Sequence, residues 1–131
     1  MKLDKFDHNE KFKKGLEIRR KWLGDDHVNP SLENADDFTA PMQQLVTENC
    51  WGAAWTREVF PLKTRSLITL SFLIALNRPH ELKLHLRAAL RNGVSKEEIR
   101  ELLVHSHAYC GWPAAIDSMR VAKELLAELK I

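Results

Sequence analysis

The sequence predicts an all-α protein of about six helices that form a single domain over residues 1–131. Apolar residues recur at spacings of three and four, which is the helical period. No segment alternates apolar and polar residues for long, so no strand is expected. Proline, glycine and capping residues also mark successive helix starts and stops. The length suits one domain of ordinary size.

The first helix is predicted to begin at Asp7, which forms a capping-box pattern with Glu10. Phe12, Leu16, Arg19 and Leu23 follow at spacings of three to four residues, which predicts an amphipathic helix. Gly24 is the expected stop, since glycine is favoured just after a helix. The polar segment 25–37 contains Pro30 and predicts a loop.

A second helix is predicted from near Thr39, with Pro41 in its first turn. Further on, Gly52 allows close backbone packing or a turn. Trp51 and Trp55 flank this glycine and make a broad apolar wall with N–H donors. Each tryptophan taken singly is also a typical core or interface residue.

The segment 62–76 is apolar on nearly all sides, which is typical of a central helix or of one in an oligomer interface. Fifteen residues without a turn signal favour a helix over a buried strand. Arg65, near its start, is costly to bury without a carboxylate, so a protein or ligand carboxylate is expected beside it.

Local signals define the next two helices. Pro79 suits the first turn of a helix over 79–92, and Gly93 is its expected stop. Ser95 and Glu98 form a capping-box pattern for the following helix. The apolar stripe of that helix consists of Ile99, Leu102, Leu103 and Ser106. It is expected to end around residues 109–111.

The last helix is predicted to open at Pro113. Its expected buried residues, which follow the helical spacing, are Ile116, Met119, Leu125, Leu126 and Leu129.

Composition excludes several functions. Up to Thr64 the chain has ten basic and eleven acidic residues, and the net charge is +2, so no nucleic-acid partner is expected. The apolar run 67–76 is too short to span a bilayer, and residues 1–5 lead into no signal-peptide core, so no membrane partner is expected. Cys50 and Cys110 predict free thiols in a reducing cytoplasm.

Glu81 and His85 form the most suggestive pair of polar residues. They are four residues apart on one predicted helix and so share a face. A carboxylate can orient an imidazole and keep its far nitrogen basic, which suits proton transfer. Arg78 lies just before this helix and could hold an anion. The alternative is a solvated surface pair contributing about 0.2–0.5 kcal/mol.

Metal and thiol chemistry are less favoured. His80, Glu81 and His85 miss the His-Glu-x-x-His motif, because the two histidines are five apart and point to different sides of the helix. His105 and His107 are two residues apart, so they do not lie on one face of a helix either. No metal site is therefore expected. A dithiol centre usually has Cys-x-x-Cys spacing, which this chain lacks.

Arginines offer a third chemistry. Arg57, Arg65 and Arg78 lie beside the apolar stripes, and such a set would suit a small dianion through paired contacts on its carboxylates. Each of them alone is more often a surface residue.

Nearly the whole chain, in order and at matching spacing, resembles the 4-carboxymuconolactone decarboxylase family. The segments that carry the resemblance are 15–20, 23–24, Glu48 with 51–52 and Trp55, 65–67, 81–82 with His85, 92–93, 98–99, 109–111 and 113–115. The wider superfamily includes alkylhydroperoxidase D-like proteins, whose helical active segment carries Cys-x-x-Cys-x-x-x-His. At those positions this chain has Arg78, Glu81 and His85, which argues against a thiol peroxidase.

The resemblance implies an activity that needs no cofactor: 4-carboxymuconolactone loses carbon dioxide and becomes 3-oxoadipate enol-lactone, in protocatechuate catabolism. It also implies the alkylhydroperoxidase D-like helical fold and a homo-oligomer, commonly a hexamer built as a trimer of dimers. The substrate partner is a small dicarboxylate lactone.

On this basis we assign roles as hypotheses. His85 protonates carbon and Glu81 orients it. The substrate-binding residues are Arg65 and Arg78 as carboxylate clamps, Trp51 and Trp55 as apolar walls, and His107 or Tyr109 as the oxyanion donor. Three alternatives stay open: a peroxide-reducing enzyme using a thiol, a non-catalytic oligomer that binds a small carboxylate, and a decarboxylase for another lactone.

Overall fold

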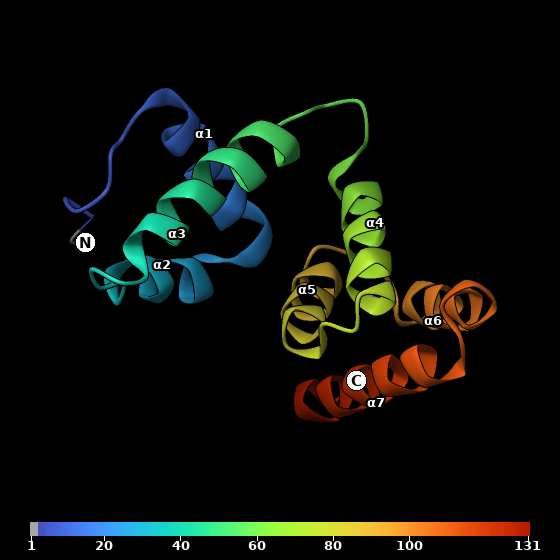
Figure 1. The fold of residues 1–131 in the computed structure, drawn as a ribbon. Helices are drawn as coiled ribbons and strands as arrows, with labels where there is room; N and C mark the ends of the chain where they lie inside the picture. Colours follow the sequence, from blue (N-terminus) through green and yellow to red (C-terminus); the bar gives the residue numbers. More distant parts are fainter. Residues whose placement is uncertain (1–2) are drawn as a thin grey trace. The chain divides into compact units, whose positions relative to one another are not determined.

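The computed structural model describes residues 3–131, and every regular element among them is helical (Figure 1). The elements are α1 (Glu10–Leu23), α2 (Asp25–Glu33), α3 (Ala40–Leu45), the π-helix η1 (Val46–Trp55), α4 (Leu62–Ala75), α5 (Pro79–Arg91), α6 (Lys96–Cys110) and α7 (Trp112–Leu129). The prediction of an all-α fold is confirmed. The helices form two compact units, of which one ends at Phe60 and the other begins at Pro61.

In the N-terminal unit α1 packs closely against η1, and two glycines make this possible. A Cβ on Gly15 would lie 1.9 Å from the carbonyl oxygen of Thr47, and one on Gly52 would lie 2.4 Å from that of Lys11. No side chain fits at such distances, so the close packing expected at Gly52 is confirmed.

Helix α1 begins later than predicted. Its N-cap is Asn9, whose Oδ1 accepts a hydrogen bond of 2.9 Å from the N–H of Phe12. The predicted capping box of Asp7 and Glu10 is therefore wrong, because the Asn9 amide oxygen already reaches the third amide of the helix. The predicted stop at Gly24 is confirmed, and its φ of 92° explains why a glycine lies there.

The predicted loop over 25–37 is wrong for most of its length, since α2 occupies Asp25–Glu33. Val28 and Leu32, one turn apart, are fully buried in the N-terminal unit. Their burial stabilises the helix by about 1.5–3 kcal/mol each, which outweighs the penalty of Pro30 inside it. The acidic first turn also suits the helix dipole.

The helix predicted from near Thr39 is present but changes type along its length. Thr39 is the N-cap of α3, and Pro41 lies in the first turn as expected. From Val46 the hydrogen bonding widens into η1, which the periodicity of the sequence did not indicate.

In the C-terminal unit, α4 packs against α5, α6 and α7, and α7 also packs against α5 and α6. The core they enclose consists of Leu70, Ile74, Leu82, Leu86, Ala89, Val94, Ile99, Leu103, Ala122 and Leu125. The predicted start of α5 at Pro79 is confirmed. So is the capping box of Ser95 and Glu98, in which both reciprocal bonds are 3.0 Å long.

Ion pairs on the surface connect these helices. Lys83 of α5 contacts Glu124 at 3.0 Å and Glu128 at 2.6 Å, both on α7. Lys63 of α4 contacts Glu98 of α6 at 2.9 Å. These surface pairs join neighbouring helices, although each adds little stability.

Burial in α7 differs from the prediction. Leu125 is fully buried, and Leu126 and Leu129 are half-buried, but Ile116 and Met119 are 43% and 40% exposed. The core is instead reached by small side chains of the first two turns, including Ala114, Ala115 and Ser118. Small residues let α7 approach its neighbours closely, which leaves the larger side chains outside.

Helix α4 also keeps apolar side chains at its surface. Phe72 and Leu76 are each 62% exposed. None of the helices in residues 3–131 combines the length and apolar content needed to cross a membrane.

Candidate functional site

Helix α5 positions the proposed proton-transfer pair. Leu82 and Leu86 are almost completely buried and anchor the helix in the core of its unit. His85 lies beside them and is only 9% exposed, whereas Glu81, one turn earlier, is exposed. The pair therefore runs from the surface at Glu81 to a buried imidazole, on one side of the helix. Because the imidazole is buried, the pair is not the fully solvated surface pair that was the alternative. The burial of His85 therefore favours a functional role for it.

Two arginines lie on the segments that adjoin this pair. Arg65 is half-buried in the first turns of α4, the helix that packs against α5. Arg78 is the exposed N-cap residue of α5, and its N–H donates to the carbonyl oxygen of Leu73 at 3.0 Å. Arg65, Arg78, Glu81 and His85 thus belong to one pair of packed helices.

The two proposed oxyanion donors lie on different sides of α6. His107 is half-buried and packs against Trp112 with tilted rings whose centroids are 4.6 Å apart, while Tyr109 is 79% exposed and packs against His105 in the same way at 5.1 Å. Two residues correspond to about 200° around a helix, so the pair cannot converge on one ligand atom.

The tautomer of His107 follows from its hydrogen bond. Its Nδ1 bonds the carbonyl oxygen of Val104, and a carbonyl can only accept, so Nδ1 carries the proton. In the neutral ring Nε2 is then an acceptor. His107 can therefore donate to an oxyanion only as the imidazolium.

Trp51 and Trp55 lie in the N-terminal unit, where they are 3% and 4% exposed. Their rings stack with centroids 4.6 Å apart, and Trp22 lies 5.8 Å from Trp55. The tryptophans thus form an aromatic cluster in the core of that unit. The other six proposed site residues lie in the C-terminal unit.

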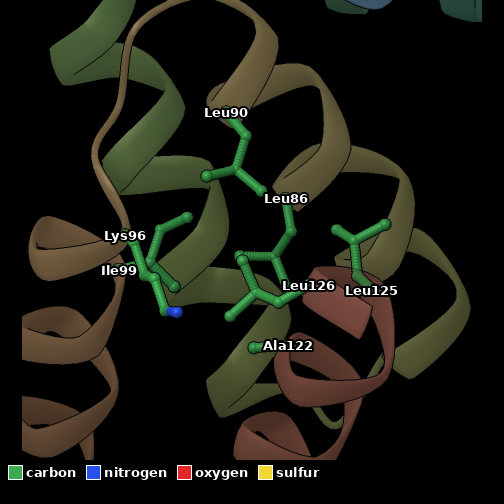
Figure 2. Close-up of a pocket in the computed structure, with 7 residues that line it drawn as sticks. All are labelled: Leu86, Leu90, Lys96, Ile99, Ala122, Leu125 and Leu126. Carbon is green, nitrogen blue, oxygen red and sulfur yellow. The ribbon is translucent and has the colours of Figure 1, made fainter. Parts of the chain in front are cut away.

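A crevice among α5, α6 and α7 provides no room for a substrate. Figure 2 shows Leu86, Leu90, Ile99 and Leu126 closing it, with the nitrogen of Lys96 as its single polar atom among the residues drawn. Its volume is about 10 Å³, which is at most the space of one water. It is a packing defect of the core.

The part of the chain from Leu3 onward brings no three His, Cys, Asp or Glu side chains together in a way that could hold a metal ion. Cys50 and Cys110 are both free thiols. Cys50 reaches the surface, yet surrounding atoms desolvate its sulfur and raise the pKa of the thiol, an effect that the charge of Arg19 partly offsets. A raised pKa disfavours the reactive thiolate.

The N-terminal unit also contains a buried polar cluster that was not predicted from the sequence. Arg19 is 6% exposed, and its guanidinium donates to Thr47 Oγ1 and Gln43 Oε1, each at 3.0 Å. The signal for it was an arginine within the apolar stripe of α1. This cluster ties α1 to α3 and η1.

An all-helical chain with a buried imidazole and flanking arginines is compatible with several classes of enzyme, and comparison with known proteins identifies the class. Residues 40–124 match the model of the Carboxymuconolactone decarboxylase family. The chain belongs to this family.

Two relatives match most of the chain. A 4-carboxymuconolactone decarboxylase of Acinetobacter baylyi is 44% identical over 93% of this chain and 91% of its own length. The nitrosuccinic acid decarboxylase npaB of Metarhizium robertsii is 40% identical over 93% of this chain and 85% of its own. A shorter match, 35% identical over 35% of this chain, is to a 4-carboxymuconolactone decarboxylase of Pseudomonas putida.

Proposed function

We propose that this protein is a carboxy-lyase that converts 4-carboxymuconolactone to 3-oxoadipate enol-lactone and carbon dioxide. The observation that carries the proposal is the 44% identity to a 4-carboxymuconolactone decarboxylase over 93% of the chain. The buried His85, on a helix that packs against the one carrying Arg65, supports the proposal, because the reaction needs a proton donor and a carboxylate clamp.

The substrate itself accepts the electrons. Its departing carboxylate lies on the γ carbon of an unsaturated lactone. When the carbon–carbon bond breaks, the electron pair moves through the double bond into the lactone carbonyl, and carbon dioxide leaves. The resulting 2-oxyfuran-like anion then takes a proton on carbon. The protein must therefore hold carboxylates, stabilise an oxyanion and deliver one proton.

His85 is the proposed proton donor to carbon. Its burial keeps bulk water from competing for the carbanion-like intermediate, and Glu81 lies one turn away at the surface of the same helix, where it would orient the ring. The pair would also connect the buried imidazole to solvent, from which the proton is restored after each turnover.

Arg65 and Arg78 are the proposed carboxylate clamps. Their most useful target is the acetate side chain that stays on the product, because tight binding of the leaving carboxylate would stabilise the ground state and slow the reaction. The roles of Trp51 and Trp55 as apolar walls, and of His107 or Tyr109 as oxyanion donor, stay predictions. Of the last two, His107 needs to be protonated for that role.

A second candidate substrate follows from the other long match. The relative from Metarhizium robertsii is a nitrosuccinic acid decarboxylase, and it is nearly as similar to this chain. A nitro group accepts an electron pair as a lactone carbonyl does, so the same acid and the same clamps would serve. We place this substrate second, because its relative has the lower identity.

The test is direct. The purified protein is incubated separately with 4-carboxymuconolactone and with nitrosuccinic acid, and carbon dioxide and the organic product are followed. We expect the enol-lactone to appear at a rate proportional to enzyme, without added metal, cofactor or thiol. Product from nitrosuccinic acid alone would support the second candidate. Turnover of hydroperoxide that depends on Cys50 or Cys110, with no carbon dioxide from either acid, would refute both.

We further propose that the working enzyme is a homo-oligomer, with a hexamer as the expected state. The exposed Phe72 on α4 and Leu76 at its C-cap support this, since exposed large apolar side chains are typical of an interface. A cytoplasmic location and a single domain over 1–131 stay predictions. The family match over residues 40–124 extends across the junction of the two units, which supports the prediction of a single domain.

A further inference from the structure

Three exposed apolar side chains of the N-terminal unit form what we call the α3 stripe: Phe38, Met42 and Leu45, which are 90%, 68% and 52% exposed. The carbonyl oxygen of Asp36 accepts a bond of 2.8 Å from the N–H of Ala40, which is the helical spacing. Helical register therefore begins before α3. Steps of four and three residues then place the three side chains along one side.

Two exposed acidic side chains, Asp36 and Asp37, directly precede Phe38 of the α3 stripe. The carboxylate of Asp36 accepts bonds of 2.9–3.0 Å from the N–H groups of Phe38 and Thr39, which orders the turn and lowers the pKa of this carboxyl. Asp37 is exposed beside it.

Residues 22–56 contain six acidic residues and no lysine or arginine, while two cations from earlier in the chain bond to this segment. Lys5 Nζ donates to the carbonyl oxygen of Ala35 at 2.6 Å, and Arg19 donates to Gln43 at 3.0 Å.

The C-terminal unit carries an apolar hollow with a basic rim, which we call the α6–α7 groove. It consists of two adjoining pockets of about 390 and 410 Å³ that share Leu103, Met119 and Lys123. Large apolar side chains line it while staying exposed in the single chain: Val104 (47%), Trp112 (65%), Ile116 (43%) and Met119 (40%).

The rim of the α6–α7 groove is basic. Lys96, Arg100, Arg120 and Lys123 line the two pockets, and Figure 2 shows Lys96 beside the apolar Ile99. One acidic side chain, Asp117, binds Arg120 at 2.6 Å. The groove thus combines an apolar floor with an excess of cations.

We propose that the α3 stripe of one copy of this chain docks into the α6–α7 groove of a second copy. Anchors at positions i, i+4 and i+7 are the pattern by which a helix fills an apolar groove. Acidic residues around the stripe meet basic residues around the groove, which favours this orientation and speeds encounter. Every copy carries both surfaces, so the occupant is present wherever the protein is.

This inference rests on the proposed oligomer and deepens it by naming the two surfaces. It also accounts for the exposure of Ile116 and Met119, which the helical spacing of α7 predicted to be buried. In the assembly the stripe would cover them.

The test uses two variants with complementary defects, studied by sedimentation velocity over a range of concentrations. Phe38→Ala with Met42→Lys breaks the stripe and leaves the groove intact. Ile116→Lys with Met119→Lys breaks the groove and leaves the stripe intact. We expect the dissociation constant for self-association to rise about tenfold or more in each variant. An equimolar mixture should recover association, because one groove still receives one stripe.

A charge exchange gives an independent readout with little risk to folding, since both residues are exposed. Asp37→Lys should weaken association, and adding Lys123→Glu in the same chain should restore it. The circular dichroism spectrum of every variant should match that of the parent.

Several results would overturn the inference. A mixture that associates no better than its components excludes the stripe-to-groove contact between copies. Protection of the groove against hydrogen exchange that is independent of concentration indicates that another part of the same chain occupies it. If both double variants associate as tightly as the parent, neither the α3 stripe nor the α6–α7 groove takes part in self-association. The decarboxylation assay uses the unmodified protein, so failure of the proposed function is seen separately.

Discussion

At the scale of single residues, burial separates the members of the proposed site. The spacing of Glu81 and His85 places both on one face of α5, yet His85 is only 9% exposed while Glu81 lies at the surface. Removing an imidazole from water is costly unless neighbouring groups compensate. A buried histidine beside a surface carboxylate is therefore the first place to test for proton transfer.

Replacing His85 with glutamine should lower kcat by about 10²–10⁴, because the amide cannot deliver a proton to carbon. The Michaelis constant should change little. Steady-state kinetics with 4-carboxymuconolactone measures both. His80→Gln is the matched control, since His80 is exposed in the first turn of the same helix and should leave kcat near that of the parent. A His85→Gln enzyme with nearly normal turnover would remove the proposed role.

Replacing Arg65 with alanine should raise the Michaelis constant about ten- to hundredfold, the loss expected for a charged hydrogen bond to a carboxylate. The Michaelis constant of Arg65→Lys should lie between those of the parent and Arg65→Ala, because lysine retains the charge but not the paired geometry of the guanidinium. The split between KM and kcat distinguishes a clamp from a proton donor. An unchanged KM in Arg65→Ala would count against the clamp.

At the scale of elements, two kinds of contact hold the helices in place. Backbone proximity at Gly15 brings α1 against η1, and reciprocal hydrogen bonds between Ser95 and Glu98 start α6. The first depends on the absence of a side chain, and the second on the charge of one carboxylate. Each can be tested without touching the proposed site.

Gly15→Ala should destabilise the N-terminal unit by about 3 kcal/mol, at the upper end of overpacking effects, because the new Cβ would lie 1.9 Å from a backbone oxygen. Urea unfolding followed by circular dichroism measures this. Gly93→Ala is the control: its φ is +97° and nothing lies within 4 Å, so only backbone strain of about 1–2 kcal/mol is expected. Equal losses in the two variants would contradict the packing account.

Glu98 should make stability depend on pH in the acid range. Its hydrogen bonds from Ser95 and the neighbouring Lys63 lower the pKa of this carboxyl below its usual 4.5. A lowered folded-state pKa gives stability that is complete above 4.5 and is lost as the pH falls through the folded value. The free energy of unfolding of Glu98→Gln should therefore decline less steeply on acidification than that of the parent.

The control for this experiment is Glu97→Gln, one residue earlier in the same turn. It should follow the parent curve. If the free energy of unfolding of Glu98→Gln depends on pH in the same way as that of the parent, ionisation of Glu98 does not contribute to stability.

At the scale of the whole molecule, apolar surface points to assembly. Phe72 on α4 is 62% exposed, and Trp112 on α7 is 65% exposed. A chain of 131 residues has few faces on which to hide such groups, whereas an oligomer can cover them.

We expect the unmodified protein to sediment at micromolar concentration as an oligomer, with six chains of 15.1 kDa as the expected state. Sedimentation equilibrium gives the mass without assumptions about shape. A single species of one chain over the whole concentration range would contradict the proposed assembly, and with it the docking of the α3 stripe.

Most helix boundaries with a local signal were predictable, the exception being the start of α1, where Asn9 is the cap in place of Asp7. Pro79 has no N–H to lose in a first turn, Gly93 takes a positive φ, and Ser95 with Glu98 satisfies two free amides. In contrast, α2 was missed because its stability comes from burying Val28, which depends on the rest of the unit.

The candidate site was predictable in kind but only partly in arrangement. Spacing placed Glu81 and His85 on one face, and the structure keeps them on one helix. Spacing could not show that His85 is buried, nor that the bond of His107 to Val104 turns its free nitrogen into an acceptor. Both depend on which surfaces the neighbouring helices cover.

The sequence by itself determined the helical class, most helix limits and membership in the decarboxylase family, because periodicity, caps and residue identity act over a few positions. Only the tertiary structure decided which apolar side chains are covered. Ile116 and Leu125 both follow the stripe of α7, yet one is 43% exposed and the other is fully buried. Burial is a property of pairs of surfaces, so no single stretch of chain can specify it.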